Sequence, residues 1–416
     1  MKQCKEKLPD LASRMEKIHP FHVMRVLKQA QDMEKTGREV IHMEVGEPDF
    51  TTPEPIIKAA QNALTNGYTK YTPAAGITEL REAIARFYQE RYGVSVSPER
   101  IIITPGATGA LQLVLAALLN VGDEVLLPDP GYPCNRHYVE LLNARPRPVP
   151  VSANHDYQPA HVDLVSRWNA ATRVLMLASP ANPTGTVLAL HELEAYAELI
   201  TKQNTLTRSK THLVVDEIYH GLTYQDDSSS PLQTALSLSN TDNLFVVNSF
   251  SKYFGMTGWR LGWVVAPENY IEALDRLAQN LFLCAPTVSQ YAALAAFKPE
   301  SITIMEQRRQ AFKQRRDLIL PALREMGFDI PVTPEGAFYI YANCHALCHK
   351  AGMNSTQLAA DILSKTGVAI TPGLDFGDYQ SDEFVRFAYT TNTANLDKAM
   401  HKLKNYFKQA GFLVAS

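Results

Sequence analysis

Five short segments of the sequence carry side chains that could do chemistry, and each follows a run of apolar residues. They are Thr104–Gly109, Asp129–Tyr132, Ser179–Gly185, Asp216–Tyr219 and Ser249–Lys252. Together they supply small residues, aromatic rings, an amide, a carboxylate, hydroxyls and a lysine amine. Open α/β sheets bind ligands beyond the carboxyl ends of their strands. We therefore expect these segments to meet at one edge of a sheet.

Each segment taken alone also has a simpler explanation. The glycines of Gly106–Gly109 could form an ordinary strand–helix turn, since they match neither a dinucleotide-binding nor a P-loop pattern. Asn182 could initiate a turn, Asp216 could be a loop carboxylate or cap, and Lys252 could be a solvated surface lysine. The tyrosines could be packing residues. These explanations do not account for the joint occurrence of all five segments at successive strand ends.

One kind of chemistry needs the whole set. A lysine amine forms a Schiff base with an aldehyde, and a carboxylate beside a pyridine nitrogen keeps the ring protonated as an electron acceptor. A phenol and an amide can hydrogen-bond a ring hydroxyl, and an aromatic side chain can stack on the ring. Hydroxyls, backbone N–H groups and an arginine bind phosphate. The cofactor with all these groups is pyridoxal 5′-phosphate.

The segment around the lysine resembles the lysine motif of class I/II aminotransferases, which have fold type I of the pyridoxal-phosphate enzymes. It reads Ser249-Phe-Ser-Lys252-Tyr-Phe-Gly-Met-Thr-Gly258-Trp-Arg260-Leu-Gly262. Further matches occur in the family's order at Gly46–Phe50, Tyr71–Gly76, Asn182–Gly185, Asp216–Tyr219 and Arg386. The resemblance extends over nearly the whole chain. It is similar to the bacterial and archaeal aspartate/aromatic/alanine aminotransferase branch.

The resemblance implies a role for each matching residue. Lys252 would hold the cofactor as a Schiff base and move the proton at the substrate Cα, while Asp216 would pair with the pyridine nitrogen and Tyr219 would contact the ring hydroxyl. These three are the expected catalytic residues. The expected cofactor-binding residues are Ala107, Thr108, Tyr132, Asn182, Asp216, Tyr219, Ser249, Ser251, Lys252, Arg260 and Tyr71. Tyr71 would reach the cofactor of a neighbouring subunit, which implies a homodimer with shared active sites.

The expected substrate-binding residues are Gly46, Asn182 and Arg386. The resemblance implies that Arg386 binds the substrate α-carboxylate through its planar guanidinium group and that the Gly46 backbone lies against the same carboxylate. Arg386 alone could also form a surface ion pair. On a strand, however, it shares its face with Phe384 and Ala388, and this apolar setting favours a buried anion as its partner.

We therefore interpret the chain as an aminotransferase that moves an amino group from an L-amino acid to a 2-oxo acid by a ping-pong mechanism. The alternative among enzymes is a lyase or synthase of the same fold, such as a carbon–sulfur β-lyase. A regulatory domain that binds the cofactor is disfavoured, because the chain has no basic patch for DNA. The pattern assigns no arginine to a second substrate carboxylate, since Arg14, Arg25, Arg38 and Arg136 all lack a predicted place.

The elements that must position these residues alternate between short apolar runs and helical patterns. We expect strands at 101–103, 124–127, 147–151, 173–177, 212–215, 244–248 and 261–265, with helices near 107–119, 136–142, 163–168 and 191–201. Such near-continuous apolar strands indicate a parallel sheet that is covered on both faces. The connection from residue 248 to the last strand is too short for a crossover helix, so that strand should be antiparallel.

The predicted fold class is therefore α/β: fold type I, with a large domain built on a mostly parallel seven-stranded sheet and a smaller α+β domain. We expect a large cofactor-binding domain at 45–290 and a small domain from 1–44 and 291–416. The helical region 15–36 should dock on the small domain. We also expect Pro299 and Pro321 to interrupt the helical stretch 286–326.

The composition fits an ordinary globular enzyme. The chain has 416 residues and a formal net charge of −3, and no apolar run reaches the roughly 18 residues that span a membrane. We therefore expect no nucleic-acid or membrane partner. The N-terminus lacks the apolar core of a signal peptide, and the five scattered cysteines fit a reducing compartment, so we expect a cytoplasmic location. The Cys and His residues at 344–349 do not have a metal-site spacing, and we expect no metal.

Overall fold

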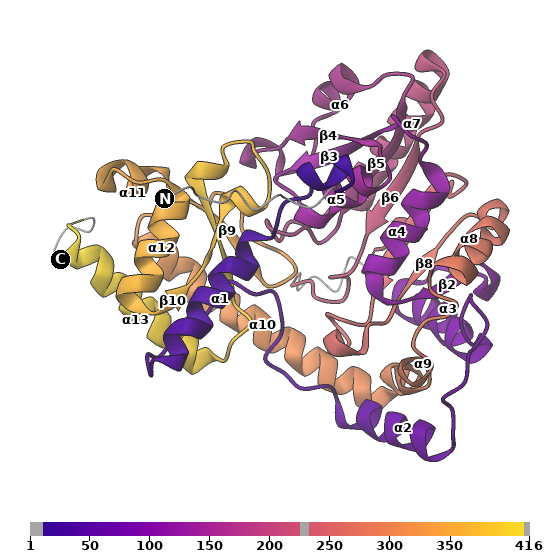
Figure 1. Ribbon diagram of the computed structural model, residues 1–416, viewed down its shortest axis with the longest axis horizontal. Helices are drawn as coiled ribbons and strands as arrows, with labels where there is room; N and C mark the ends of the chain where they lie inside the picture. The colour runs from indigo at the N-terminus through magenta and orange to yellow at the C-terminus, as the bar shows by residue number, and fades with distance from the viewer. Residues whose placement is uncertain (1–10, 225–232, 412–416) are drawn as a thin grey trace, which may run out of the picture.

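The computed structural model describes residues 11–224 and 233–411, and a seven-stranded sheet lies at its centre (Figure 1). The strand order is β2-β8-β7-β6-β5-β3-β4. Their bounds are β2 (Ile101–Thr104), β3 (Glu124–Asp129), β4 (Arg145–Pro150), β5 (Thr172–Ala178), β6 (His212–Asp216), β7 (Leu244–Ser249) and β8 (Gly262–Val265). β8 runs antiparallel to its two neighbours, β2 and β7, and the other neighbouring strands pair in parallel. The predicted seven-stranded, mostly parallel sheet is confirmed, including the direction of its last strand.

Helices cover both faces of this sheet, as the continuous apolar strands require. Val214 of β6 packs in one core with residues of α4 and α8, whereas its neighbours Leu213 and Val215 pack in the core on the opposite face. The helices of this part are α2 (Glu54–Thr65), α3 (Thr78–Tyr92), α4 (Gly106–Leu118), α5 (Pro133–Leu141), α6 (His161–Arg167), α7 (Leu190–Thr207), α8 (Glu268–Leu281) and α9 (Thr287–Ala293).

Two smaller sheets lie beside the central one. An antiparallel sheet has the order β11-β12-β9, from Thr371–Pro372, Phe384–Ala388 and Tyr339–Asn343, and β1 (Ile41–His42) pairs with β10 (Val368–Ala369). The helices here are α1 (His22–Lys35), α10 (Pro299–Glu325), α11 (His345–Ala351), α12 (Ser355–Thr366) and α13 (Thr393–Gln409). Short 3-10 helices lie at Ser13–Glu16, Pro98–Arg100, Ala153–His155, Ala235–Ser237, Thr257–Trp259, Leu294–Phe297, Gly373–Asp375 and Ser381–Glu383.

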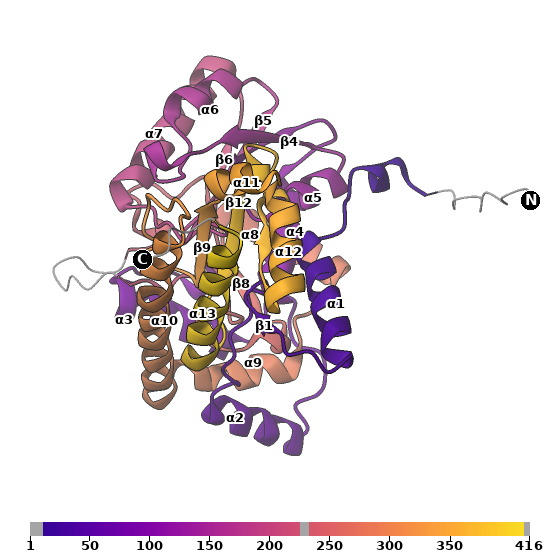
Figure 2. The ribbon, with the colours of Figure 1, turned by 90° about the vertical axis from the view of Figure 1, so that its left-hand side faces the viewer.

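The N-terminal helix α1 docks on these smaller sheets, as the sequence predicted. Val26 and Ala30 of α1 form a small core with Leu363 of α12 and Ala369 of β10. Both ribbon views place α1 beside α12 (Figures 1 and 2). The division into domains at residues 45 and 290 stays a prediction.

One sequence expectation about the helices is wrong. Pro299 does separate two helices, because it occupies the first turn of α10, where its missing N–H costs nothing. Pro321, however, lies inside α10, which continues to Glu325. A proline in a helix interior gives up one backbone hydrogen bond. Here the buried side chains of Leu320 and Leu323 hold this last turn in the core, and this packing outweighs the local preference.

The described residues contain no helix that is long and apolar enough to cross a membrane. They also contain no group of three or more His, Cys, Asp or Glu side chains that could hold a metal ion. Cys4 lies outside the described residues, and the cysteines inside them, Cys134, Cys284, Cys344 and Cys348, are free thiols. The cytoplasmic location stays a prediction.

The first residue of β8 provides a test of the packing between the sheet and α4. A Cβ on Gly262 would lie 2.7 Å from the Ala107 nitrogen and 2.8 Å from the Asn248 carbonyl oxygen, and neither backbone atom can move without shifting its element. We expect Gly262→Ala to lower the free energy of unfolding by about 1–3 kcal/mol, measured by urea denaturation. Gly258→Ala is the matched control, because an added Cβ there meets no atom within 4 Å. Equal effects of the two changes would contradict this account.

Candidate active site

A cavity of about 130 Å³ lies at the carboxyl ends of the central strands. It is lined by Ala107, Thr108, Leu111, Tyr132, Tyr138, Asp216, Ile218, Ser249, Ser251, Lys252, Thr257 and Arg260. Eight of these are among the eleven residues that the sequence predicted to bind a cofactor. The strand ends therefore meet as expected, because parallel strands bring their carboxyl ends to one edge of the sheet.

One end of the cavity has the donors that an anion needs. Helix α4 begins there at Gly106 with no side-chain cap, so the N–H groups of its first turn point toward the cavity end. The hydroxyl-bearing Ser249 and Ser251 and the guanidinium group of Arg260 line the same cavity. Arg260 has a φ of 51°, an unfavourable conformation that is concentrated at functional sites. This donor set fits a phosphate group.

Gly106 is required next to this arginine. A Cβ at Gly106 would lie 2.8 Å from an Arg260 guanidinium nitrogen, and the φ of 73° at Gly106 also disfavours a side chain. The glycine thus lets the guanidinium group approach the start of α4.

The cavity also contains a buried acid, Asp216, which forms no ion pair among the described residues. Asp216 ends β6 with 4% of its surface exposed, and among the described residues its carboxylate accepts one hydrogen bond, from the Ile218 N–H at 3.2 Å. Burial is the main cause that raises the pKa of Asp216 to about 7, and the Glu217 charge adds to it. A protonated ring nitrogen would supply the missing partner, so this residue fits the pyridine end of pyridoxal phosphate.

Lys252 supplies an amine that is easily deprotonated. Its Nζ donates to the Gly46 carbonyl oxygen at 2.7 Å and lies 5.7 Å from the ring centres of both Tyr219 and Phe338. Burial lowers the pKa of Lys252 to about 8, and the positive charges of Arg386 and Arg260 lower it further, against the opposing charge of Glu47. A substantial part of this lysine is therefore neutral, and nucleophilic, in mildly alkaline solution.

Arg386 is a buried cation beside the same site. It is 4% exposed, its Nη1 donates to Asn182 Oδ1 at 2.9 Å, and its Nη2 donates to the Glu44 carbonyl oxygen at 2.5 Å. The guanidinium carbon lies 4.3 Å from the ring centre of Tyr339 and 4.7 Å from that of Phe376. Among the described residues, its Nε has no hydrogen-bond partner and no acidic side chain forms an ion pair with it. This geometry fits an external carboxylate.

Two of the predicted cofactor ligands lie just outside the cavity lining. Asn182 contacts Arg386, and the Tyr219 hydroxyl is 2.7 Å from the Tyr339 hydroxyl. The sequence did not predict this contact. A Cβ on Gly46 would overlap the Tyr339 hydroxyl, so the glycine allows the two segments to touch. The clustered aromatic residues at 338–341 were the available signal.

Tyr71 does not join the site within one chain. It is 81% exposed and lines neither this cavity nor the one beside it. Its predicted action on a neighbouring subunit therefore stays a prediction.

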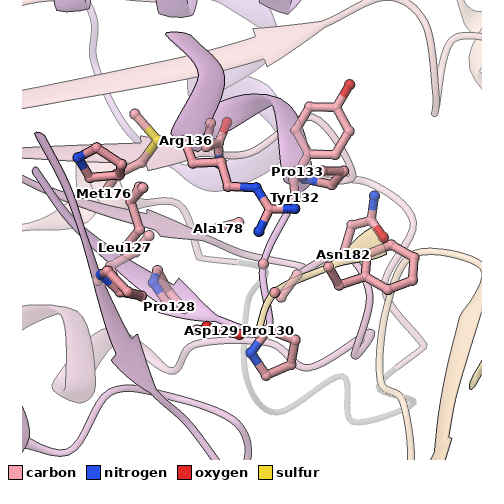
Figure 3. Close-up of a pocket in the computed structure, with 18 of the residues that line it drawn as sticks. Leu127, Pro128, Asp129, Pro130, Tyr132, Pro133, Arg136, Met176, Ala178 and Asn182 are labelled. Atoms are coloured by element: carbon pink, nitrogen blue, oxygen red, sulfur yellow. The ribbon is translucent and has the colours of Figure 1, made fainter. Parts of the chain in front are cut away.

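A second cavity of about 280 Å³ adjoins the first, and both are lined by Tyr132 (Figure 3). It also includes Asn182 and Phe376, which contact Arg386. Figure 3 shows the Arg136 guanidinium group projecting into the middle of this cavity. The sequence had no place for Arg136, because only the packing of α5 against the strands brings it here.

Comparisons with known proteins agree with this geometry. Residues 38–403 match the family model described as aminotransferase class I and II. The valine–pyruvate aminotransferase of Mycobacterium tuberculosis is 36% identical over 94% of this chain and 96% of its own length. The aspartate aminotransferase of Pyrococcus horikoshii is 32% identical over 95% and 96%. A crystal structure of an aminotransferase from M. tuberculosis superposes with a TM-score of 0.89 and 35% identity, covering 96% of this chain and all of that one.

The lowered pKa of Lys252 can be tested on the cofactor-free chain. We expect pyridoxal phosphate followed by borohydride to label Lys252 half-maximally near pH 8, because only the neutral amine reacts, whereas surface lysines should require about two units more. Peptide mass spectrometry across the pH range measures the labelling of Lys252 and of the surface lysines in the same sample. Half-maximal labelling of Lys252 at the pH of the surface lysines would contradict the assignment.

Proposed function

The chain belongs to the class I and II aminotransferases, and we propose that it transfers amino groups between amino acids with neutral side chains and 2-oxo acids. It is a pyridoxal-phosphate-dependent transaminase, and the names of its relatives support transamination rather than the lyase alternative. One observation supports the proposed residue roles. Lys252, Asp216 and Arg386 carry charges without a full set of partners, and all three lie beside one cavity.

The proposed roles follow from these charges. When bound, pyridoxal phosphate supplies an aldehyde that takes up the amino group and a ring that accepts the electrons left at the substrate Cα. Arg386 binds and orients the substrate α-carboxylate, which places the Cα hydrogen near Lys252. Lys252, whose pKa lies near 8, takes and returns that proton as a general base and acid. Asp216 would place a negative charge beside the ring nitrogen, and Tyr132 would provide an aromatic face for the ring.

The second cavity supports the proposal of neutral side chains. Most of its lining is apolar or proline, and its charged members are Arg136, Asp129, Glu140 and Asp378. Asp129 accepts backbone N–H groups of residues 378 and 379, and Glu140 lies 3.3 Å from a nitrogen of His137. One guanidinium group and three carboxylates therefore share the lining of this cavity. This balance disfavours a second carboxylate on the substrate, because like charges repel strongly where water is excluded.

A substrate panel tests this function. We expect kcat/KM for valine or phenylalanine to exceed that for aspartate or glutamate by about tenfold or more, with pyruvate and 2-oxoglutarate each tried as acceptor. Appearance of the new amino acid without free ammonia distinguishes transamination from lyase chemistry. If the enzyme prefers aspartate and Arg136→Gln removes that preference, the cavity binds acidic side chains and this proposal is wrong.

The role of Asp216 is testable by removing its charge while keeping its shape. Asp216→Asn should still bind the cofactor, but the single-turnover rate with an amino acid should fall by about 100-fold or more, because stabilisation is lost mainly in the transition state. Asp216→Glu should be milder. If Asp216 were only a loop cap, asparagine would serve equally well, and a rate within a few-fold of wild type would indicate this.

We also propose that the active unit is a homodimer in which Tyr71 acts in the partner's site. The exposure of Tyr71 in the single chain supports this, because a large aromatic side chain at 81% exposure is available to a neighbour. Chains with Tyr71→Ala and chains with Lys252→Ala should each be impaired. Mixed in equal amounts, they should recover about a quarter of wild-type activity, since half the dimers then contain one intact site. No recovery on subunit exchange would argue against sharing.

A further inference from the structure

A short backbone segment holds both cations of the proposed site. Beyond β1, the Glu44 carbonyl oxygen accepts from Arg386 Nη2 at 2.5 Å and from Thr371 Oγ1 at 3.0 Å. Two residues later, the Gly46 carbonyl oxygen accepts from Lys252 Nζ at 2.7 Å. The position of segment 44–46 therefore sets where Arg386 and Lys252 lie relative to each other. Any contact that fixes this segment therefore also affects how Arg386 is oriented to bind the substrate carboxylate.

The side chain of Glu44 is an unusual part of this segment. It is fully buried, its Oε1 lies 2.7 Å from His42 Nδ1, and its Oε2 has no hydrogen-bond partner among the described residues. A buried carboxylate is stable only with a paired charge or several hydrogen bonds. His42 is the one described side chain that pairs with it.

His42 carries that charge at neutral pH. Its hydrogen bond to Glu44 is the main cause that raises the pKa of His42 to about 9, and Glu34 of α1, whose Oε1 is 3.2 Å from His42 Nε2, contributes. The imidazole is 34% exposed. Helix α13, which also packs near β1, presents Lys398 and Lys402, and both of these pair with Glu39. The charges facing His42 are thus those of two carboxylates.

We propose that His42 and Glu44 are positioning residues, whose ion pair fixes the segment that orients Arg386 for the substrate carboxylate. This rests on the proposed function of Arg386. Without the imidazolium charge, the Glu44 carboxylate has no described partner and must move toward water, and this movement displaces the carbonyl that holds Arg386. Both the amino acid and the 2-oxo acid bind through their carboxylate, so binding of both weakens more than the proton transfer at Lys252 does.

The experiment measures binding of a carboxylate that has no amine to titrate. The inhibition constant of 3-methylbutanoate and the KM of the 2-oxo acid should each rise about tenfold in His42→Gln, with kcat changed less than about threefold. His401→Gln is the matched control, because His401 also pairs with a carboxylate, of Asp397, but lies exposed on α13. It should leave both constants unchanged.

The pH profile separates positioning from a merely structural role. His42 is charged below its pKa, so carboxylate binding by the wild type should be strong below about pH 9 and weaken as the pH rises through that value. His42→Gln should bind weakly at all pH values and lack this transition. Glu44→Gln, if it folds, should behave like His42→Gln.

The outcomes distinguish this inference from the proposed function. The positioning role alone is wrong if the wild type transaminates normally and His42→Gln keeps the wild-type inhibition constants and the same pH transition. A wild type with no transaminase activity on any amino acid, or an Arg386→Lys variant with unchanged carboxylate binding, would instead remove the function on which it rests.

Discussion

The site depends on charged side chains that are buried without a full set of partners, and the rest of the structure must hold them in place. Asp216 and Arg386 are buried and Lys252 is half-buried, and none of the three forms an ion pair with an opposite charge among the described residues. Such groups are costly in isolation. They persist because rigid elements hold them, namely the end of β6, the turn after β7 and the middle of β12. The stability of the large sheet thus supports a site that is unfavourable until its ligands bind.

Glycines at defined positions allow these elements to approach. Gly106, Gly262 and Gly46 each stand where a side chain would overlap an atom of the site or of its support. The first two bring Arg260 and β8 against the start of α4, and the third lets the segment before α2 touch Tyr339. Close backbone approach therefore replaces side-chain packing around the cofactor cavity, which leaves donors free for the ligand.

The relatives at about one-third identity include enzymes named for valine and for aspartate, so the family does not fix the side chain that is accepted. In this chain we propose that the choice is set by the cavity that Asn182, Phe376 and residues of α5 line. Its one guanidinium group shares the lining with three carboxylates, and on this proposal the balance of these charges decides the preference more than the presence of an arginine does. The proposed role of the His42–Glu44 pair is different, because it affects binding of the α-carboxylate that all substrates share and not the choice of side chain.

The sequence by itself determined the order and type of the main elements and eight of the twelve residues that line the cavity at the strand ends. Apolar runs of strand length predict strands that are covered on both faces of the sheet. The short connection before β8 requires that strand to be antiparallel. The lysine segment carries its chemistry in consecutive residues, so eight cavity-lining residues could be named in advance.

Only the tertiary structure decided the rest. The Tyr219–Tyr339 contact, the hold of Glu44 on Arg386 and the place of Arg136 each join segments that lie far apart along the chain. Pro321 continues a helix because side chains elsewhere in the core fix its last turn. Local sequence patterns record the preferences of neighbouring residues, whereas these features arise from distant backbones packing at fixed separations, which no pattern along the chain encodes.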